Sequence, residues 1–187
     1  MVIIGHDPGG GFAVRNTQGK VTGYPLPDTD TEVYALLKSI NDSATVGFDP
    51  PVKMPVRMVS EQVGGFIGKR PIFKKCPGCG LTTTEWQGDP GSRMFVFGEK
   101  FGLVKGMGIA LGFRMETVQP KAWQKVVGMF RDKAESRTVW KRRLKDQAMK
   151  FYPGIKITLA TSDAFLILDY AIRVKPVEKV ENAVLAF

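Results

Sequence analysis

The chain has 187 residues, 43% of them hydrophobic, which suits one globular domain with a buried core and leaves little room for a second domain. Lysine and arginine total 27 against 18 acidic residues, so the formal charge of +9 and the pI near 9.6 favour polyanionic partners, nucleic acid before an anionic membrane. No apolar stretch has the length of a transmembrane helix and the N-terminus lacks a signal-peptide pattern, which predicts a cytoplasmic protein without a membrane partner.

An acidic residue ends the first predicted strand. The β-branched run over residues 2–4 predicts a buried strand that carries Asp7 at its end, directly before Pro8 and three glycines. Hydrogen bonding within a turn would explain Asp7, because Asp before Pro-Gly often caps a turn. The alternative is that Asp7 faces a cation while the glycines let another backbone, a phosphate or a strand approach closely. Strand alternation directs the neighbouring His6 to the opposite face, which predicts a structural role for it.

The next segments predict a hairpin, a helix and a second acidic strand. Alternating runs on both sides of "NTQG" predict a hairpin, so three antiparallel strands open the domain. Thr29, three residues before Glu32, has the spacing of a capping box and predicts the start of the first helix. After three prolines, "VRMVSEQV" returns to extended spacing and places Glu61 near the end of a strand.

A long segment at about 64–93 is predicted to be a loop, since it is rich in glycine and proline and has no steady period. Its basic and aromatic side chains could pair with phosphates and stack on exposed bases, whereas the alternative is a solvated loop with its aromatic rings folded back. The residues assigned to DNA contact in this loop are Lys69, Arg70, Phe73, Lys74, Lys75, Trp86 and Arg93.

Two cysteines, Cys76 and Cys79, lie in the same segment. Their spacing in "CPGCG" is that of half a zinc site, but the chain has no other cysteine and one histidine. Four ligands are needed for structural zinc, so an intrachain site would require carboxylates or a partner chain. A tight turn that could respond to redox conditions is therefore favoured over a bound metal.

A glycine-rich helix follows the loop. In "FVFGEKFGLVKGMGIALGF" the helical period returns, and Gly98, Gly102 and Gly106 recur every fourth residue to form one smooth groove. Each glycine costs about 1 kcal/mol of helix propensity relative to alanine. The groove therefore indicates close approach by a strand, another helix or a symmetry mate, and packing against the sheet is favoured. "RMETVQP" then predicts a further strand, and "KAWQKVVGMF" a helix that begins beside Pro120.

Basic residues dominate the region from 121 to 145, where nine lysines or arginines face two acids. Such a run is usually a solvated helix face, but beside an acidic metal site it favours contact with nucleic acid. The residues assigned to DNA contact outside the loop are Lys100, Lys105, Lys121, Lys125, Arg142 and Arg143.

The stretch "TSDAFLILDYAIR" predicts a C-terminal helix that Thr161 or Ser162 caps. Asp163 lies in its first turn, where the helix dipole alone would favour a carboxylate by about 0.3 to 1 kcal/mol, so a capping role is the alternative to a chemical one. Asp169, six residues further on, lies about 240° around the helix and is predicted to be on the surface.

The three acids, at two strand ends and one helix start, coincide with a resemblance to the RuvC-like Holliday junction resolvases of the ribonuclease H-like superfamily, in particular the phage-type members. In chain order, "IIGHDPGGG" and "VSEQV" resemble the two acidic strands of this family, "GSRMFVFGEKFGLVKGMGIALGF" its central helix, "ETVQPKAWQK" its Pro-x-x-Trp junction and "TSDAFLILDYA" its acidic C-terminal helix. The resemblance implies one α/β domain over 1–187, with a mixed sheet in which three antiparallel strands precede parallel ones and helices on both faces.

The resemblance also implies an activity. It is that of a homodimer which cuts four-way (Holliday) or other branched DNA junctions by divalent-metal-dependent hydrolysis, in a bacterial or phage-infected cell. Asp7 would bridge two Mg²⁺ or Mn²⁺ ions, with Glu61 and Asp163 each completing one side. The carboxylates would repel each other without metal. The basic loop replaces a shorter segment of the family and is expected to approach the junction centre.

One position departs from the family pattern. The family places a further acid about one helical turn before the position of Asp163, where this chain has Ala160. Three acids could suffice with water or Ser162 filling the gap, Ala160 could inactivate the site, or Asp49 could substitute in space. A catalytically silent junction-binding protein, and a ribonuclease H-like nuclease that acts on flaps or RNA–DNA hybrids, therefore remain alternatives.

Overall fold

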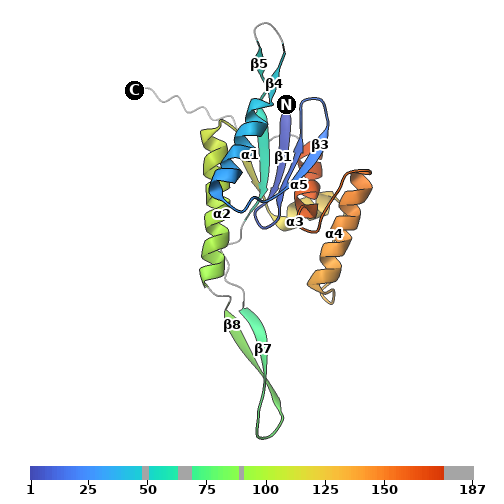
Figure 1. Cartoon of the computed structure of the whole chain (residues 1–187). Coiled ribbons are helices and arrows are strands. Elements are labelled where there is room, and N and C mark those ends of the chain that lie inside the picture. The colour runs from blue at the N-terminus through green and yellow to red at the C-terminus, as the bar shows by residue number, and fades with distance from the viewer. Residues whose placement is uncertain (48–50, 63–68, 89–90, 175–187) are drawn as a thin grey trace, which may run out of the picture.

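The computed structural model describes residues 1–47, 51–62, 69–88 and 91–174. Its centre is a five-stranded mixed sheet with the strand order β3-β2-β1-β6-β9 (Figure 1). The strands are β1 (Val2–Asp7), β2 (Gly11–Arg15), β3 (Val21–Pro25), β6 (Val56–Glu61) and β9 (Arg114–Val118). Strands β1 to β3 are antiparallel neighbours, whereas β6 and β9 extend the other side of β1 in parallel. This order confirms the predicted α/β architecture.

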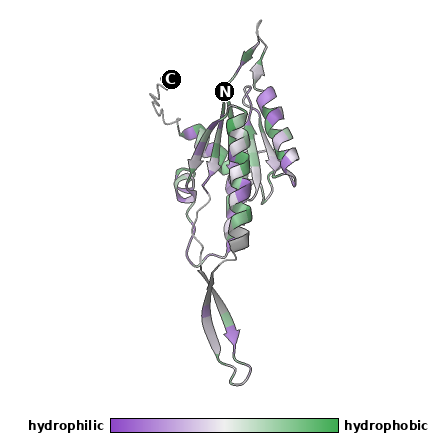
Figure 2. Ribbon diagram, turned by 90° about the vertical axis from the view of Figure 1, so that its left-hand side faces the viewer, coloured by the Kyte–Doolittle hydropathy of each residue, from purple (hydrophilic) through white to green (hydrophobic). Residues whose placement is uncertain are grey.

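Helices cover both faces of the sheet, as predicted. They are α1 (Asp30–Asp42), α2 (Gly91–Ala110), α3 (Pro120–Val126), α4 (Arg137–Phe151) and α5 (Ser162–Arg173). Because side chains alternate along β1, Ile4 joins a core with α1 and α2, whereas Ile3 joins a second core with α3, α4 and α5. The ribbon coloured by hydropathy shows apolar and polar residues alternating along α1 and α2 (Figure 2). In the described ranges, every helix is too short or too polar to cross a bilayer.

The first helix begins as its sequence predicts. The Thr29 hydroxyl accepts a hydrogen bond from the Glu32 amide at 3.3 Å, and the Thr29 amide donates to the Glu32 carboxylate at 3.1 Å. This reciprocal pair satisfies two amide groups at the start of α1. The residues Val33, Leu37 and Ile40 are buried on one side of the helix, at the spacing that its amphipathic pattern requires.

His6 occupies the α1–α2 side of the sheet. Its ring is fully buried and stacks on Phe12 with centroids 4.6 Å apart, while its Nδ1 lies 2.8 Å from the Ser60 hydroxyl. Burial lowers the pKa of His6 to about 3, so the ring is neutral at physiological pH. These contacts agree with the structural role predicted for His6, and alternation directs Asp7 to the other face.

The predicted long loop at about 64–93 is wrong in its described part. Residues 69–88 form an antiparallel ribbon of β7 (Lys69–Lys75) and β8 (Thr82–Gly88), in which Lys75 pairs with Thr82 across the turn. The pairing has a physical basis, because three consecutive β-branched threonines open β8 and a glycine-containing turn joins the strands. A second short ribbon of β4 (Thr45–Val46) and β5 (Val52–Lys53), which the sequence did not predict, follows α1.

The expectation that the glycine stripe of α2 packs against the sheet is also wrong. A Cβ atom added at Gly98, Gly102 or Gly106 would meet no atom within 4 Å. The side of α2 that packs on the sheet instead presents Val104, which is buried, and Gly108, which lies against Met115. The rotation of α2 about its axis therefore directs the stripe into open space.

Candidate active site

Two of the predicted acids meet at the carboxyl edge of the sheet. Strands β1 and β6 are parallel neighbours, and His6 pairs with Ser60, so Asp7 and Glu61 follow at matched positions. The carboxyl ends of parallel strands lie at one edge of a sheet, which is where ligands collect in open α/β folds. The register of this strand pair therefore brings the two carboxylates together from positions far apart in the sequence.

Helix α5 brings the third acid to the same edge. A Cβ atom at Gly5 would overlap the Ala164 carbonyl oxygen and the Leu168 amide. Because glycine has no side chain at this position of β1, α5 can lie directly on the strand. This close approach places Asp163, in the first turn of α5, beside the end of β1. The glycines after Asp7 act in the same way, because a Cβ atom at Gly10 would overlap the Ala160 carbonyl. The sequence left open whether a backbone, a phosphate or a strand approaches the glycines after Asp7. The structure shows that the backbone of the turn before α5 does.

Each carboxylate has a defined hydrogen-bond partner. Asp7 Oδ1 accepts from the amide of Gly9 at 3.0 Å, which is the local turn contact that the sequence offered as an explanation for Asp7. Glu61 Oε2 accepts from the indole Nε1 of Trp123 at 2.8 Å. These contacts orient the two carboxylates, but the Asp7 turn contact leaves its second oxygen available.

Asp163 binds a lysine that the sequence analysis did not select. Lys141 Nζ on α4 lies 2.5 Å from Asp163 Oδ2, and the buried hydroxyl of Ser162 donates to Asp163 Oδ1 at 3.0 Å. The side chain of Lys141 is 30% exposed and that of Asp163 is 10% exposed. Lys141 belongs to the basic run, but its pairing with an acid 22 residues away depends on how α4 packs on α5. The spacing of Arg137, Lys141 and Lys145 on one helix face is the only local signal.

Thr161 occupies the N-cap position of α5 as predicted, but the predicted side-chain capping bond is absent. Thr161 is the N-cap residue, but its side chain makes no capping bond and instead accepts from the amide of Thr158 at 3.1 Å. The hydroxyl of Ser162 lies 3.2 Å from the Leu159 carbonyl oxygen and 3.0 Å from Asp163. Neither hydroxyl caps α5, and the amide of Ser162 donates instead to the Thr158 carbonyl at 3.0 Å.

The electrostatic environment of the cluster disfavours negative charge. Burial and then the neighbouring Asp163 raise the pKa of Asp7 to about 6, against the smaller lowering effect of Lys141. Burial and then the neighbouring Asp7 raise the pKa of Glu61 to about 7. One lysine therefore does not compensate three clustered carboxylates, and an added cation would be attracted to them.

The donor set has the chemistry of a Mg²⁺ or Mn²⁺ site, because carboxylate oxygens are the ligands that these hard cations prefer. Within the described ranges, however, no three side chains of Asp, Glu, His or Cys converge closely enough to enclose a metal ion as they stand. Two contacts keep the carboxylates apart: Glu61 is hydrogen-bonded to Trp123, and Asp163 is paired with Lys141. The residues suit a divalent cation in type and share one edge of the sheet, and Lys141 would compete with such a cation for Asp163.

Ala160 lies at the site, in the exposed turn that precedes α5. The amide of Ser162 donates to the Thr158 carbonyl at 3.0 Å, so a helical turn extends back through position 160. The carbonyl of Ala160 lies beside Gly10, and the position that a Cβ of Gly10 would occupy is also 2.5 Å from Asp7 Oδ2. The backbone at position 160 is thus close to Asp7. Asp49, the other acid considered as a substitute, lies outside the described residues.

Asp169 does not belong to this cluster and is not a surface residue as predicted. Its side chain is 14% exposed and pairs with Arg173 Nε at 2.6 Å, one helical turn along α5. Burial raises the pKa of Asp169 above its ordinary value, against the smaller effect of Arg173. Asp169 does lie on a different side of α5 from Asp163, as its position around the helix predicts, but the side that carries Asp169 packs against the protein.

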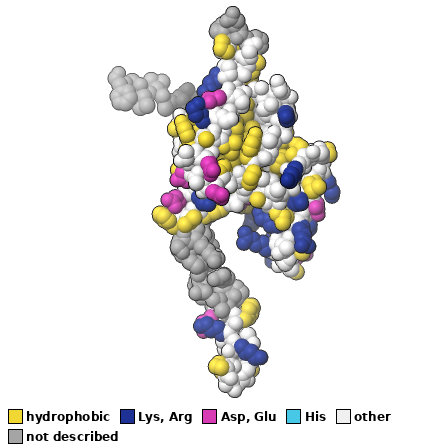
Figure 3. Space-filling view, in the orientation of Figure 1, with side chains coloured by type: hydrophobic (Ala, Val, Ile, Leu, Met, Phe, Trp, Pro, Cys, Tyr) yellow, Lys and Arg dark blue, Asp and Glu magenta, His cyan; other side chains and the backbone are white. Residues whose placement is uncertain are grey.

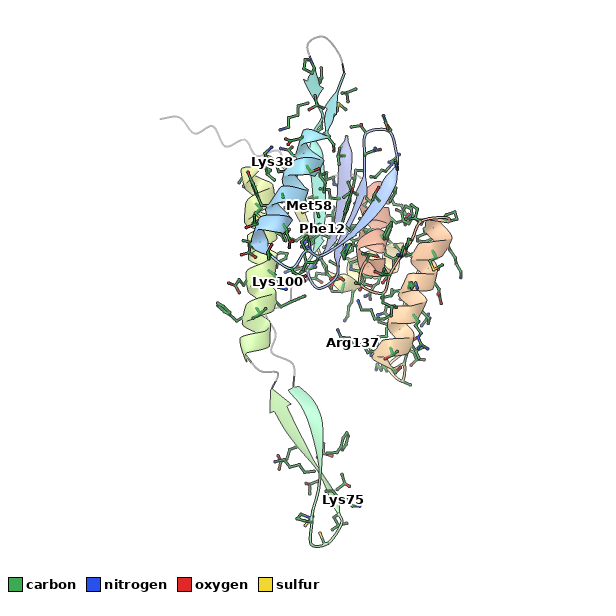
Figure 4. The ribbon with its side chains drawn as sticks, in the orientation of Figure 1. Phe12, Lys38, Met58, Lys75, Lys100 and Arg137 are labelled. Carbon is green, nitrogen blue, oxygen red and sulfur yellow. The ribbon has the colours of Figure 1, made fainter. Side chains whose placement is uncertain are left out.

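The residues predicted to contact DNA occupy several elements. Those with exposed side chains are Phe73, Lys74 and Lys75 on β7, Lys100 and Lys105 on α2, Lys121 and Lys125 on α3, and Arg142 and Arg143 on α4. The side chains of Lys69, Arg70, Trp86 and Arg93 lie outside the described residues. Lys74 pairs with Glu85 at 2.6 Å, and Arg143 pairs with Glu135 at 2.8 Å. Figure 3 shows basic side chains around the lower part of α4, where Figure 4 places Arg137.

Comparison with solved structures identifies the fold. The RuvC protein of Thermus thermophilus in complex with a Holliday junction substrate aligns with a TM-score of 0.54 and 12% identity, over 90% of this chain and 90% of that chain. A second Thermus thermophilus RuvC structure aligns with a TM-score of 0.46 and 13% identity, over 90% of this chain and 91% of that chain. No protein family matches the sequence, and no curated protein sequence matches it. The chain therefore has a RuvC-like, ribonuclease H-like fold.

Proposed function

We propose that the chain is a structure-specific endonuclease of the phage type that resolves four-way DNA junctions with Mg²⁺ or Mn²⁺. The observation that carries the proposal is the meeting of Asp7, Glu61 and Asp163 at one edge of the sheet, where burial and mutual repulsion raise the pKa of the first two. Such a cluster attracts divalent cations. The structural similarity to a RuvC protein that holds a Holliday junction substrate supports DNA as the substrate.

The three carboxylates have distinct roles in this proposal. Asp7 would bridge two ions, while Glu61 and Asp163 would each complete one side. Divalent ions bound there would supply positive charge at the cleaved phosphate and activate a water molecule. Trp123 keeps Glu61 in place through its indole N–H. Lys141, once released from Asp163, would remain in reach of an anionic phosphate.

The basic surface supports a nucleic acid partner. Exposed lysines and arginines on α2, α3 and α4 flank the carboxyl edge, and phosphate contacts of this kind position a protein on DNA without reading sequence. The side chain of Phe73, on the projecting β7–β8 ribbon, is 69% exposed and is followed by Lys74 and Lys75. An exposed ring beside basic groups can stack on an unpaired base, so the ribbon is proposed to approach the junction centre.

A homodimer would present two such sites to opposing strands. Helix α2 exposes Phe95, Val96 and Ile109, with exposed fractions of 71%, 48% and 58%, on the element that also carries the open glycine stripe. Exposed apolar side chains and a groove without side chains favour close packing of a second copy. The proposal places the protein in the cytoplasm of a bacterial or phage-infected cell.

The test is cleavage of a synthetic four-way junction in Mg²⁺ or Mn²⁺, with linear duplex as the control substrate. Symmetric nicking that Asp7→Asn abolishes would establish a resolvase that works with three acids. The double variant Phe73→Ala, Trp86→Ala should weaken junction affinity while sparing duplex affinity. Unchanged junction affinity would refute the role of the ribbon, and the absence of any preference for junctions would refute the proposal.

Ala160 favours a second candidate, a catalytically silent junction-binding protein, because its backbone lies near Asp7 and its side chain cannot bind metal. This candidate predicts junction binding without cleavage, and recovery of cleavage in Ala160→Asp. The same assay therefore separates it from the resolvase. A strictly monomeric protein that cuts flaps or RNA–DNA hybrids would instead indicate a general ribonuclease H-like nuclease.

A further inference from the structure

The turn at the end of the β7–β8 ribbon presents two cysteines to solvent. The ribbon extends away from the sheet, and Lys75, the last residue of β7, lies near its end (Figures 1 and 4). The amide of Cys76 donates to the Leu81 carbonyl at 2.8 Å, and the amide of Gly80, at φ +70°, donates to the Cys76 carbonyl at 3.0 Å. Both Cys76 and Cys79 are exposed and unbridged. The backbone thus forms a closed turn with both thiols on one short loop.

The spacing of the two cysteines suits a single metal ion. Cys76 and Cys79 lie three residues apart, which is the spacing of many paired zinc ligands, on a turn that the backbone hydrogen bonds of Cys76 and Gly80 close. Two thiolates from one such turn can bind the same ion, so the turn supplies half of a four-ligand site.

Neither packing nor turn formation explains these two cysteines. Free cysteine is usually a buried residue, whereas both of these side chains are exposed. The turn itself needs a left-handed residue, and Gly80 provides it. Two thiols at an exposed position therefore point to a ligand for sulfur.

The remaining ligands must come from outside the chain's own cysteines and histidine. Structural zinc takes four ligands, and this sequence contains two cysteines and one histidine. That histidine, His6, is fully buried and bonded to Ser60. On the described part of the ribbon, the acid Glu85 lies opposite Ile72 and pairs with Lys74, away from the turn. A second copy of the same turn would supply two further thiolates.

We propose that Cys76 and Cys79 bind zinc and that the turns of two chains complete a four-thiolate site. The projection of the ribbon from the body lets two turns meet while the sheets stay apart (Figure 1). The site would join two chains through their ribbons, independently of any contact between the α2 helices. It does not depend on whether the chain cleaves DNA.

Cobalt tests the proposal, because Co²⁺ replaces Zn²⁺ and reports thiolate ligands by ultraviolet charge-transfer absorption. The full chain, reduced and freed of metal by a chelator, is titrated with Co²⁺ and then with Zn²⁺. The expected result is thiolate absorption that saturates at one Co²⁺ for two chains and disappears when Zn²⁺ is added. Binding of Co²⁺ to the carboxylates of the candidate active site would give no thiolate absorption, so the two sites are distinguished.

Three variants complete the test. Cys76→Ser and Cys79→Ser should each lose the thiolate absorption, whereas Thr84→Ser, an exposed change on the same ribbon, should keep it. The melting temperature of each variant without metal should equal that of the parent chain, because the substituted side chains are exposed. Saturation at one Co²⁺ per chain would overturn the shared site. Absorption that survives both cysteine substitutions, or no thiolate absorption at all, would overturn the metal site.

Discussion

Replacing Asp7 by asparagine is expected to stabilise the metal-free protein above pH 6. The folded protein holds the Asp7 proton up to about pH 6, whereas an unfolded aspartate releases it near the ordinary value of 3.8. Between these values the folded state binds more protons, so the free energy of unfolding falls as pH rises. A shift of about two pKa units corresponds to about 3 kcal/mol at 1.36 kcal/mol per unit. Asparagine keeps the shape of the side chain without its charge, so it removes the loss of stability that ionisation of Asp7 causes.

The assay is urea denaturation in EDTA from pH 4 to pH 8. The stability of Asp7→Asn relative to the parent should increase from about pH 4 to about pH 7, because loss of the Asp7 charge also favours the ionised form of Glu61, whose pKa in the parent is about 7. Asp146→Asn, which changes an exposed carboxylate on α4, is the matched control and should show no such rise. Added Mg²⁺ at pH 8 should stabilise the parent and not Asp7→Asn. A variant that is equally or less stable than the parent at every pH would refute the electrostatic reasoning.

Two further substitutions, together with the control substitution Gly98→Ala, test the packing that positions the site. Arg57→Ala should lower the free energy of unfolding, measured by urea denaturation, by about 3 to 5 kcal/mol. It removes a buried guanidinium that donates to both oxygens of Glu116, at 3.0 and 2.8 Å, and to the Ala171 carbonyl at 2.6 Å. A loss under 1 kcal/mol would show that the pair is dispensable. Gly5→Ala should destabilise the fold by about 1 to 3 kcal/mol or more, since α5 must move away from β1. Gly98→Ala, at an open position on α2, should instead be neutral or stabilising by up to about 1 kcal/mol, and equal effects in melting experiments would contradict the contact between β1 and α5.

Local patterns were sufficient to predict most of the fold. The capping box at Thr29 depends on residues three apart, and the strand that ends at Glu61 depends on a short apolar run. In both cases the interactions that determine the structure lie within one element. The sheet order followed from the family resemblance together with the two acidic strand ends, because parallel pairing of β1 and β6 is what brings Asp7 beside Glu61.

Features that depend on the rotation or docking of a whole element could not be predicted. The glycine stripe of α2 has the same spacing whether it faces the sheet or open space, and only the packing of Val104 and Gly108 determines which. Asp169 was assigned to the surface from its angle relative to Asp163, but an angle gives no information on what packs against that side. The β7–β8 ribbon was missed because its composition resembles that of a loop, and strand pairing decides its structure.

The pairing of Lys141 with Asp163 bears on the missing acid. The cluster carries three carboxylates and one ammonium group, and the raised pKa values of Asp7 and Glu61 show that even this charge is held at a cost. A fourth acid at position 160, where the backbone lies close to Asp7, would raise that cost further in the metal-free protein and would increase the attraction for divalent cations. Compared with an acid, alanine at this position therefore makes the metal-free protein more stable and lowers its affinity for metal. Under the proposed function, activity then depends on how strongly the three carboxylates bind metal in competition with Lys141.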